Sequence, residues 1–222
     1  MLDWQWDFTL EIMPRLLVAT LNTLMAAGFG YLIALVLGLV FALLQRTRRP
    51  WLTFAVRELV EFVRSTPLVL QIFFVFYVGP QFGIRLSPWT SGMIAIGLHY
   101  AAYLSEVYRA GLDNVPRGQW EACIALNLSP RRTYLGIIIP QAIPPSIPGF
   151  GNYLVGIFKD TPMLSVIGVA ELMHTANALG SETYRFLEPY TMVGVIFLAI
   201  SLPSAWLIRQ FEKWLRRRLG LE

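Results

Sequence analysis

Charged residues are scarce in this chain of 222 residues: 14% are Asp, Glu, Lys or Arg, whereas 55% are hydrophobic. A soluble domain of this length needs far more charge to cover its surface. We therefore predict an integral membrane protein with a single helical domain over 1–222 and no separate catalytic domain. The net charge of +4 does not indicate nucleic-acid binding, because the basic residues follow the membrane pattern described below.

Cysteine and histidine are also scarce. Cys123 is the single cysteine, which excludes an internal disulfide, and with only two histidines the sequence offers no metal cluster. The chain also has no glycine-rich phosphate loop, no pair of histidines four residues apart and no serine in a nucleophile elbow. We therefore expect no enzymatic activity, no metal and no cofactor bound by this chain. A membrane-embedded enzyme is the disfavoured alternative.

Five apolar stretches are long enough to cross a hydrocarbon core, which needs roughly 17–25 helical residues. Because these stretches are continuous rather than alternating, they predict helices and not the strands of a barrel. The expected fold is all-α, a membrane bundle of five transmembrane helices. Their predicted ranges are 16–44, 58–78, 90–110, 147–170 and 189–209.

Most of the basic residues lie on one side of these predicted helices. By the positive-inside rule, that side is the cytoplasm, so we expect a cytoplasmic C-terminus and an N-terminus outside. The residues on the cytoplasmic side are Arg46, Arg48, Arg49, Arg57, Arg109, Arg117, Arg131, Arg132, Arg209, Lys213, Arg216, Arg217 and Arg218. The opposite side holds Arg15, Arg85 and Arg185.

The first predicted helix carries a small residue at every fourth position, and such a stripe lets another helix approach closely. It comprises Ala26, Gly30, Ala34, Gly38 and Ala42. The partner helix belongs either to the same chain or to another subunit, and the sequence leaves both alternatives open.

Charged residues inside the predicted spans are candidates for function, because such groups face a cavity or one another. They are Glu61, Arg64, Glu106, Lys159 and Asp160. Arg64 and Lys159 each open a similar sequence, Arg64-Ser65-Thr66-Pro67 and Lys159-Asp160-Thr161-Pro162. Each proline breaks helical geometry at the threonine before it. Helices broken at related places indicate a transport site at mid-membrane depth.

These charged residues also have purely structural interpretations. Glu61 and Arg64 are three residues apart and can pair on one helix face, and Glu106 can pair with Arg109. Lys159 and Asp160 are adjacent, so they point apart on a regular helix and need different partners. We expect His99 to be an ordinary buried residue, with a proton relay as the less favoured alternative.

A polar segment at about 115–141 interrupts the apolar spans. Gln119 to Leu126 suits one short helix, and Ser129-Pro130 begins a second one, with proline in the first helical turn. Asn127 stands between them, where a left-handed residue is needed and Asn is second only to Gly. An amphipathic linker lying on the membrane is the alternative interpretation.

This segment resembles the cytoplasmic signature of bacterial ABC importer permeases, which reads Glu-Ala-Ala, then Gly, then Ile-x-Leu-Pro. The matching residues are Glu121, Ala122, Cys123, Asn127, Ile137, Ile139 and Pro140. Three of them depart from the pattern: Cys123 replaces the second Ala, Asn127 replaces Gly and Ile139 replaces Leu. The resemblance implies a type I importer fold in which this segment couples to the ATPase, with Glu121 in polar contact and Ala122 permitting close docking.

Nearly the whole chain is similar to the polar amino acid permease branch of that family, and pieces such as Trp4-x-Trp6-Asp7-Phe8 resemble the ectoine/hydroxyectoine permease. The resemblance implies two ATPase subunits that bind the ATP, a second permease subunit that is homologous or identical, and an extracytoplasmic solute-binding protein. It also implies a location in the bacterial inner membrane. Candidate solute-pathway residues are Arg64, Thr66, Tyr103, Glu106, Lys159, Asp160 and Thr161. A permease for a polar or cationic amino acid is one alternative, and a gradient-driven carrier is another.

Overall fold

The computed structural model describes residues 4–218, and every regular element in this part of the chain is helical, as predicted. The α-helices are α1 (Trp6–Leu44), α2 (Pro50–Ser65), α3 (Leu68–Phe73), α4 (Pro88–Asp113), α5 (Arg117–Ala125), α6 (Pro130–Thr133), α7 (Ile139–Asp160), α8 (Leu172–Thr183) and α9 (Leu187–Arg218). Two π-helical segments, η1 (Phe74–Val78) and η3 (Tyr134–Ile138), and two 3-10 helices, η2 (Gly79–Phe82) and η4 (Thr161–Ile167), connect them.

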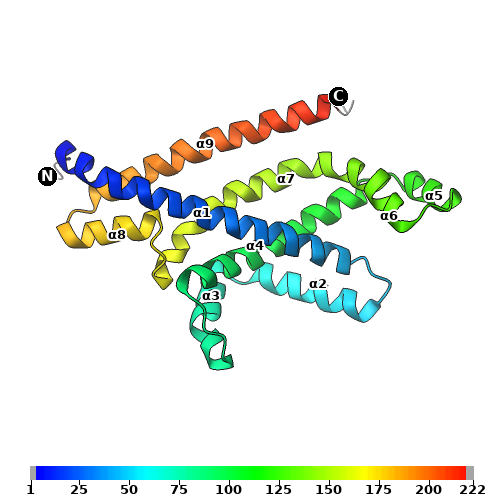
Figure 1. Cartoon of the computed structure of the whole chain (residues 1–222), viewed down its shortest axis with the longest axis horizontal. Coiled ribbons are helices and arrows are strands. Elements are labelled where there is room, and N and C mark those ends of the chain that lie inside the picture. The colour runs from blue at the N-terminus through cyan, green and yellow to red at the C-terminus, as the bar shows by residue number, and fades with distance from the viewer. Residues whose placement is uncertain (1–3, 219–222) are drawn as a thin grey trace.

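Helices α1 and α4 pack against each other at the centre of the bundle (Figure 1). The small-residue stripe of α1 faces α4. A Cβ atom added at Gly30 would lie 2.9 Å from Cγ2 of Ile96, and one at Gly38 would lie 3.0 Å from the carbonyl oxygen of Ala101. Such close approach requires glycine at both positions. Of the two predicted alternatives for the stripe, packing within the chain is therefore confirmed.

The second predicted span, 58–78, is wrong as one continuous crossing. Helix α2 ends at Ser65, and the following segment Leu68–Phe82 turns away by 109°. Thr66 has an extended backbone with φ −105° and ψ 142°, because the ring of Pro67 disfavours helical geometry before it. The break predicted at Thr161 is wrong, because this residue keeps right-handed helical geometry before Pro162, with φ −56° and ψ −31°. As Figure 1 shows, α3 and the turns after it project sideways from the bundle as an arm.

The side chain of Gln71 satisfies the polar groups that this break exposes. Its Nε2 atom donates to the carbonyl oxygen of Val63 at 2.8 Å and to Oγ1 of Thr66, also at 2.8 Å. Helix ends leave carbonyl groups without partners, and within a membrane an unpaired carbonyl is costly. The bend is therefore stabilised by Gln71, a residue of the arm itself.

The remaining predicted spans match helices with shifted ends. The range 16–44 lies within α1, 90–110 within α4 and 189–209 within α9, whereas 147–170 covers the end of α7 and the turn after it. Among residues 4–218, two helices can cross a membrane by length and composition, Trp6–Leu44 and Leu187–Leu215, or up to four if each of two bent pairs forms one span. The count of five and the orientation of the termini stay predictions.

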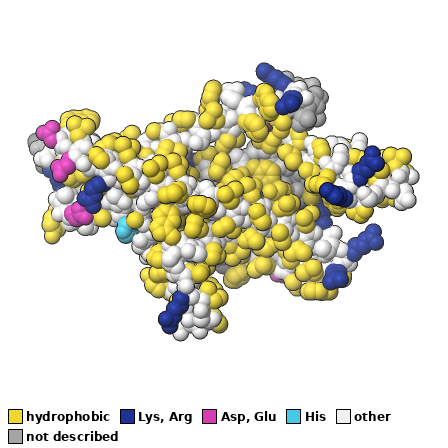
Figure 2. Space-filling model, viewed as in Figure 1, with side chains coloured by type: hydrophobic (Ala, Val, Ile, Leu, Met, Phe, Trp, Pro, Cys, Tyr) yellow, Lys and Arg dark blue, Asp and Glu magenta, His cyan; other side chains and the backbone are white. Residues whose placement is uncertain are grey.

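Charge divides the molecule along its long axis. In Figure 2, acidic side chains gather at the end that holds the N-terminus, whereas basic side chains gather toward the opposite end, near α5 and α6, the connection between α1 and α2, and the end of α9. At the N-terminal end, Arg15 of α1 forms an ion pair with Glu182 of α8 at 2.8 Å. Glu188 is fully buried there, beside Arg185 and the backbone N–H of Gln5.

Candidate functional site

Three tyrosines form an aromatic cluster where α4 meets α7. The ring centroids are 6.2 Å apart for Tyr100 and Tyr103, 6.0 Å for Tyr100 and Tyr153, and 5.5 Å for Tyr103 and Tyr153. His99 packs on Tyr103 at 5.2 Å, and its Nδ1 lies 3.2 Å from Oε1 of Gln71. We call Tyr100, Tyr103 and Tyr153 the tyrosine cluster. The faces of such rings attract cations.

The carboxylate of Asp160 adjoins the tyrosine cluster. The hydroxyl of Tyr100 donates to Oδ2 of Asp160 at 2.7 Å. Glycine at position 156 makes room for this contact, because a Cβ atom there would lie 3.0 Å from the Tyr100 hydroxyl. Within the described part of the chain, Asp160 has no ion-pair partner. The carboxylate that the Tyr100 hydroxyl contacts therefore stays available to a cation.

The neighbours of Asp160 point in other directions. Lys159 is exposed, whereas Asp160 is half-buried, as expected for adjacent residues at the end of a helix. Thr161 is fully buried, and its hydroxyl donates to the carbonyl oxygen of Phe158 at 2.8 Å. Of these three predicted pathway residues, Asp160 is the one that contacts the tyrosine cluster.

Arg64 reaches the tyrosine cluster from the end of α2. Its guanidinium lies over the ring of Tyr103, 5.4 Å from the centroid, and the Tyr103 hydroxyl donates to its carbonyl oxygen at 3.3 Å. The predicted pair with Glu61 is present but long, at 3.5 Å. The hydroxyl of Thr66 donates to the carbonyl oxygens of Phe62 and Val63, so this side chain pairs backbone groups at the end of α2.

Glu106 belongs to a chain of ion pairs that runs down α4. It accepts from Arg109 at 2.6 Å, and Arg109 also contacts Asp113 at 3.0 Å. Asp113 in turn pairs at 2.5 Å with Arg46, whose guanidinium lies over the ring of Trp120. Because six residues separate Tyr100 from Glu106 along α4, the rise between them is about 9 Å. Glu106 and Asp160 therefore lie at different levels of the bundle.

The polar segment folds as two short helices at the far end of the molecule, α5 and α6 (Figure 1). Asn127 between them has φ +48°, the left-handed conformation predicted for it. Ser129 caps α6 by accepting from the N–H of Arg132 at 3.4 Å. Glu121 and Ala122 are exposed, and Cys123 is buried beneath them.

Ile137 and Pro140 join this segment to the bundle. Ile137 packs beside the buried cluster that contains Leu112 and Ala142, and Pro140 is exposed at the start of α7. The polar segment is thus the tip of a hairpin whose two arms are α4 and α7. The same two arms carry the tyrosine cluster and Asp160.

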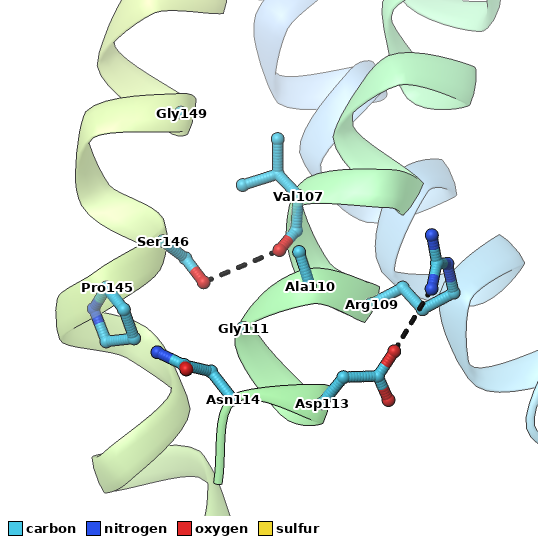
Figure 3. A pocket seen from close by; sticks show the side chains of 9 residues that line it. All are labelled: Val107, Arg109, Ala110, Gly111, Asp113, Asn114, Pro145, Ser146 and Gly149. Atoms are coloured by element: carbon cyan, nitrogen blue, oxygen red, sulfur yellow. Dashed lines mark hydrogen bonds and ion pairs between the residues drawn. The ribbon is translucent and has the colours of Figure 1, made fainter.

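The arms of this hairpin touch closely near its tip. Figure 3 shows the crevice between them, with Ser146 of α7 facing Val107 and Gly111 of α4. A Cβ atom at Gly111 would lie 2.0 Å from Oγ of Ser146, so the contact requires glycine. The Ser146 hydroxyl donates to the carbonyl oxygen of Ala142 at 2.9 Å. The two arms are therefore firmly apposed at this level.

Six residues of this arrangement were not among the sequence candidates: Arg46, Gln71, Tyr100, Asp113, Trp120 and Tyr153. The spacing of Tyr100 and Tyr103 on one helix face was a usable signal. The other contacts join residues far apart in the chain, and the sequence carries no sign of them.

Together the fold and the site define an all-helical membrane permease: charges and tyrosines lie inside the bundle, and a polar helical tip stands at one end. The chain matches the family described as binding-protein-dependent transport system inner membrane component over residues 12–217. It belongs to that family, and its relatives are transport subunits.

Curated relatives match along nearly the whole chain. The probable amino-acid ABC transporter permease protein y4tG of Sinorhizobium fredii is 44% identical, over 95% of this chain and 91% of its own. The L-cystine transport system permease protein TcyB of Bacillus subtilis is 30% identical, over 96% and 93%. A solved structure of an amino acid ABC transporter with histidines superposes with a TM-score of 0.88 at 29% identity, over 95% of this chain and 99% of that one.

Proposed function

We propose that this chain is the permease subunit of an ATP-driven importer for amino acids or amino-acid-like solutes. Relatives are named for amino-acid transport, among them permeases for L-cystine, nopaline and arginine. The observation that carries the proposal is the α4–α7 hairpin. One element holds Asp160 and the tyrosine cluster inside the bundle and the exposed Glu121 at its tip.

The solute carries a positively charged group. The unpaired Asp160 and the rings beside it suit an ammonium or amidinium, because opposite charge offsets the cost of desolvation. Arg64 or Lys159 supplies the opposite charge for a solute carboxylate. Ectoine or hydroxyectoine is the proposed solute, on the sequence resemblance, and a polar or cationic amino acid is the alternative.

In the proposed assembly the chain crosses the inner membrane with five helices, its N-terminus outside and its C-terminus in the cytoplasm. It works beside a second permease subunit, two ATPase subunits and an extracytoplasmic binding protein. The ATPases bind the ATP, and this chain binds no cofactor. Their closure pulls on α5 and α6 through Glu121, Ala122 and the residues around Asn127, which opens the pathway outward. Hydrolysis then resets it inward.

Purification of the chain from native membranes tests the proposal. We expect an ATPase subunit to copurify. Proteoliposomes made from the complex, with the binding protein added outside, should accumulate solute only when ATP is enclosed inside. Uptake driven by an ion gradient, with no copurified ATPase, would instead establish a gradient-driven carrier. Calorimetry of the binding protein with ectoine, L-arginine and L-glutamine then identifies the solute.

The coupling role of Glu121 has its own test. Replacing it by Ala removes a charged side chain that is exposed in the isolated chain. We expect Glu121→Ala to reduce ATP-driven uptake at least tenfold while the subunit stays in the membrane. Glu58→Ala, an exposed glutamate of α2 outside the polar segment, is the matched control. Equal uptake by both variants would show that Glu121 has no role in coupling.

A further inference from the structure

A second polar cavity lies between the end of α1, α2 and α4, and Arg109 lines both this cavity and the crevice of Figure 3. Its volume is about 430 Å³. The lining residues that matter here are Gln45, Arg57, Glu61, Arg64, Glu106 and Arg109. Three arginines against two glutamates give the lining an excess of positive charge.

The arginines of this cavity are incompletely neutralised. Arg109 already engages Glu106 and Asp113, and the Arg64–Glu61 pair is long at 3.5 Å. Arg57 has no acidic partner in the described part of the chain. The cavity therefore offers favourable electrostatics to an anion.

Two side chains that line the cavity each carry a buried N–H group without a hydrogen-bond partner in the described part of the chain. They are Nε of Arg64 and Nε2 of Gln45. Both are N–H groups that can only donate, so each needs an acceptor. Both atoms are covered by neighbouring side chains, so they reach an acceptor in the cavity only when their side chains turn toward it. A carboxylate brings two acceptor oxygens and a negative charge, which suit such donors and the arginines.

The cavity also adjoins the tyrosine cluster. Arg64 lines the cavity, and its guanidinium lies over the ring of Tyr103. A solute that leaves Asp160 along α4 toward Glu106 therefore passes Arg64. This continuity favours the carboxylate of the transported solute over an unrelated anion.

We propose that this cavity is a second station of the solute pathway, which binds the carboxylate of the solute through Arg57, Arg64 and Gln45. The proposal rests on the proposed function, since it takes the solute to be amino-acid-like. The cationic group of the solute binds first beside Asp160, and the carboxylate of the solute then binds in this cavity, at the next level of the bundle.

Charge-selective labelling of the assembled importer in nanodiscs tests whether the cavity accepts an anion. Thr53 lines the cavity and makes only long hydrogen bonds to Thr47, so Thr53→Cys places a thiol there with little disturbance. The thiol reacts with an anionic sulfonatoethyl or a cationic trimethylammonioethyl methanethiosulfonate of similar size. Rates are normalised to those of a free thiol, and the unmodified chain, with its buried Cys123, gives the background.

One unit charge at about 8 Å should speed the anionic reagent and slow the cationic one, each about 2- to 30-fold between effective dielectric constants of 80 and 20, so we expect the anionic reagent to be favoured by about 6- to 1,000-fold. Adding Arg57→Gln should remove this preference. Arg48→Gln, which removes an exposed arginine outside the cavity, should not. A preference for the cation, or equal effects of the two substitutions, would overturn the proposal.

Protection from labelling identifies the occupant. Ectoine, L-arginine and L-glutamine are compared with their methyl esters, in nanodiscs with and without phosphatidylglycerol. We expect at least one free acid to slow the reaction while its ester does not. Slowing that follows phosphatidylglycerol alone would assign the cavity to a lipid phosphate, and no slowing would reject an occupant. ATP-driven uptake by the same complex is measured separately in proteoliposomes, so an absence of protection together with normal uptake would reject this station without rejecting the importer.

Discussion

Replacing Asp160 by Asn removes one charge and little else. The two side chains have nearly the same shape, and the amide oxygen of Asn can still accept the hydrogen bond that the Tyr100 hydroxyl donates at 2.7 Å. The substitution thus separates the charge of Asp160 from its packing. For a cationic solute bound next to this residue, we expect affinity to fall.

The size of the loss follows from the position of Asp160. Two unit charges about 4 Å apart attract by about 4 kcal/mol at an effective dielectric constant of 20, and by about 1 kcal/mol in water. Asp160 is half-buried, so an intermediate loss of about 1–3 kcal/mol is expected. Each 1.4 kcal/mol is about tenfold in the dissociation constant. The dissociation constant should therefore rise about 5- to 150-fold.

The assay measures equilibrium binding of radiolabelled ectoine and L-arginine to the permease–ATPase complex without the binding protein, whose own affinity would otherwise dominate. Asp7→Asn, at the exposed start of α1, is the control and should leave binding unchanged. For an uncharged analogue of the solute, Asp160→Asn should cost nothing. Unchanged binding of the cationic solute by Asp160→Asn would refute the electrostatic role of this residue.

Three further predictions concern the scaffold. Asn127 has φ +48°, so Asn127→Gly should retain uptake, whereas Asn127→Val should lower stability by about 1–2 kcal/mol in thermal unfolding and reduce uptake. Glu171 is fully buried and accepts from the N–H groups of Met173 and His174, so Glu171→Ala should lower the melting temperature through loss of a helix cap worth about 0.5–2 kcal/mol. Gly38→Ala places a methyl against backbone atoms of α4 and should destabilise the bundle by about 1–3 kcal/mol, whereas at Gly28, with nothing within 4 Å, the same change should be neutral or stabilising. Equal melting temperatures for the two glycine variants would contradict the close packing of α1 on α4.

Local chemistry allowed much of the fold to be predicted. Continuous apolar runs predicted helices, and Pro67 and Asn127 act through their own backbone preferences, so the break at Thr66 and the turn between α5 and α6 follow from the sequence. The prediction of one continuous span over 58–78 was wrong because hydropathy depends on composition and not on the direction of the helix axis. An apolar segment that bends by 109° therefore has the same hydropathy as a straight one.

The site was less predictable, because its contacts join distant parts of the chain. Tyr100 and Asp160 are 60 positions apart, and Arg46 and Asp113 are 67 apart. Pairing at such separations depends on how the helices cross, and the sequence does not encode this locally. Pairs within one helix turn, Glu61 with Arg64 and Glu106 with Arg109, were foreseen because their spacing alone brings them together.

The tight contact at Gly111 gives the α4–α7 hairpin the mechanics of a lever. Gly111 lies one turn from the tip and eleven residues from Tyr100, which is about 16 Å along α4. With this contact as the pivot, the pull on the tip that we propose would tilt α4 and displace its far end. A tilt of about 10° would displace Tyr100 by roughly 3 Å, about the length of one hydrogen bond. A slight movement of α5 and α6 would thus suffice to part the Tyr100 hydroxyl from its carboxylate.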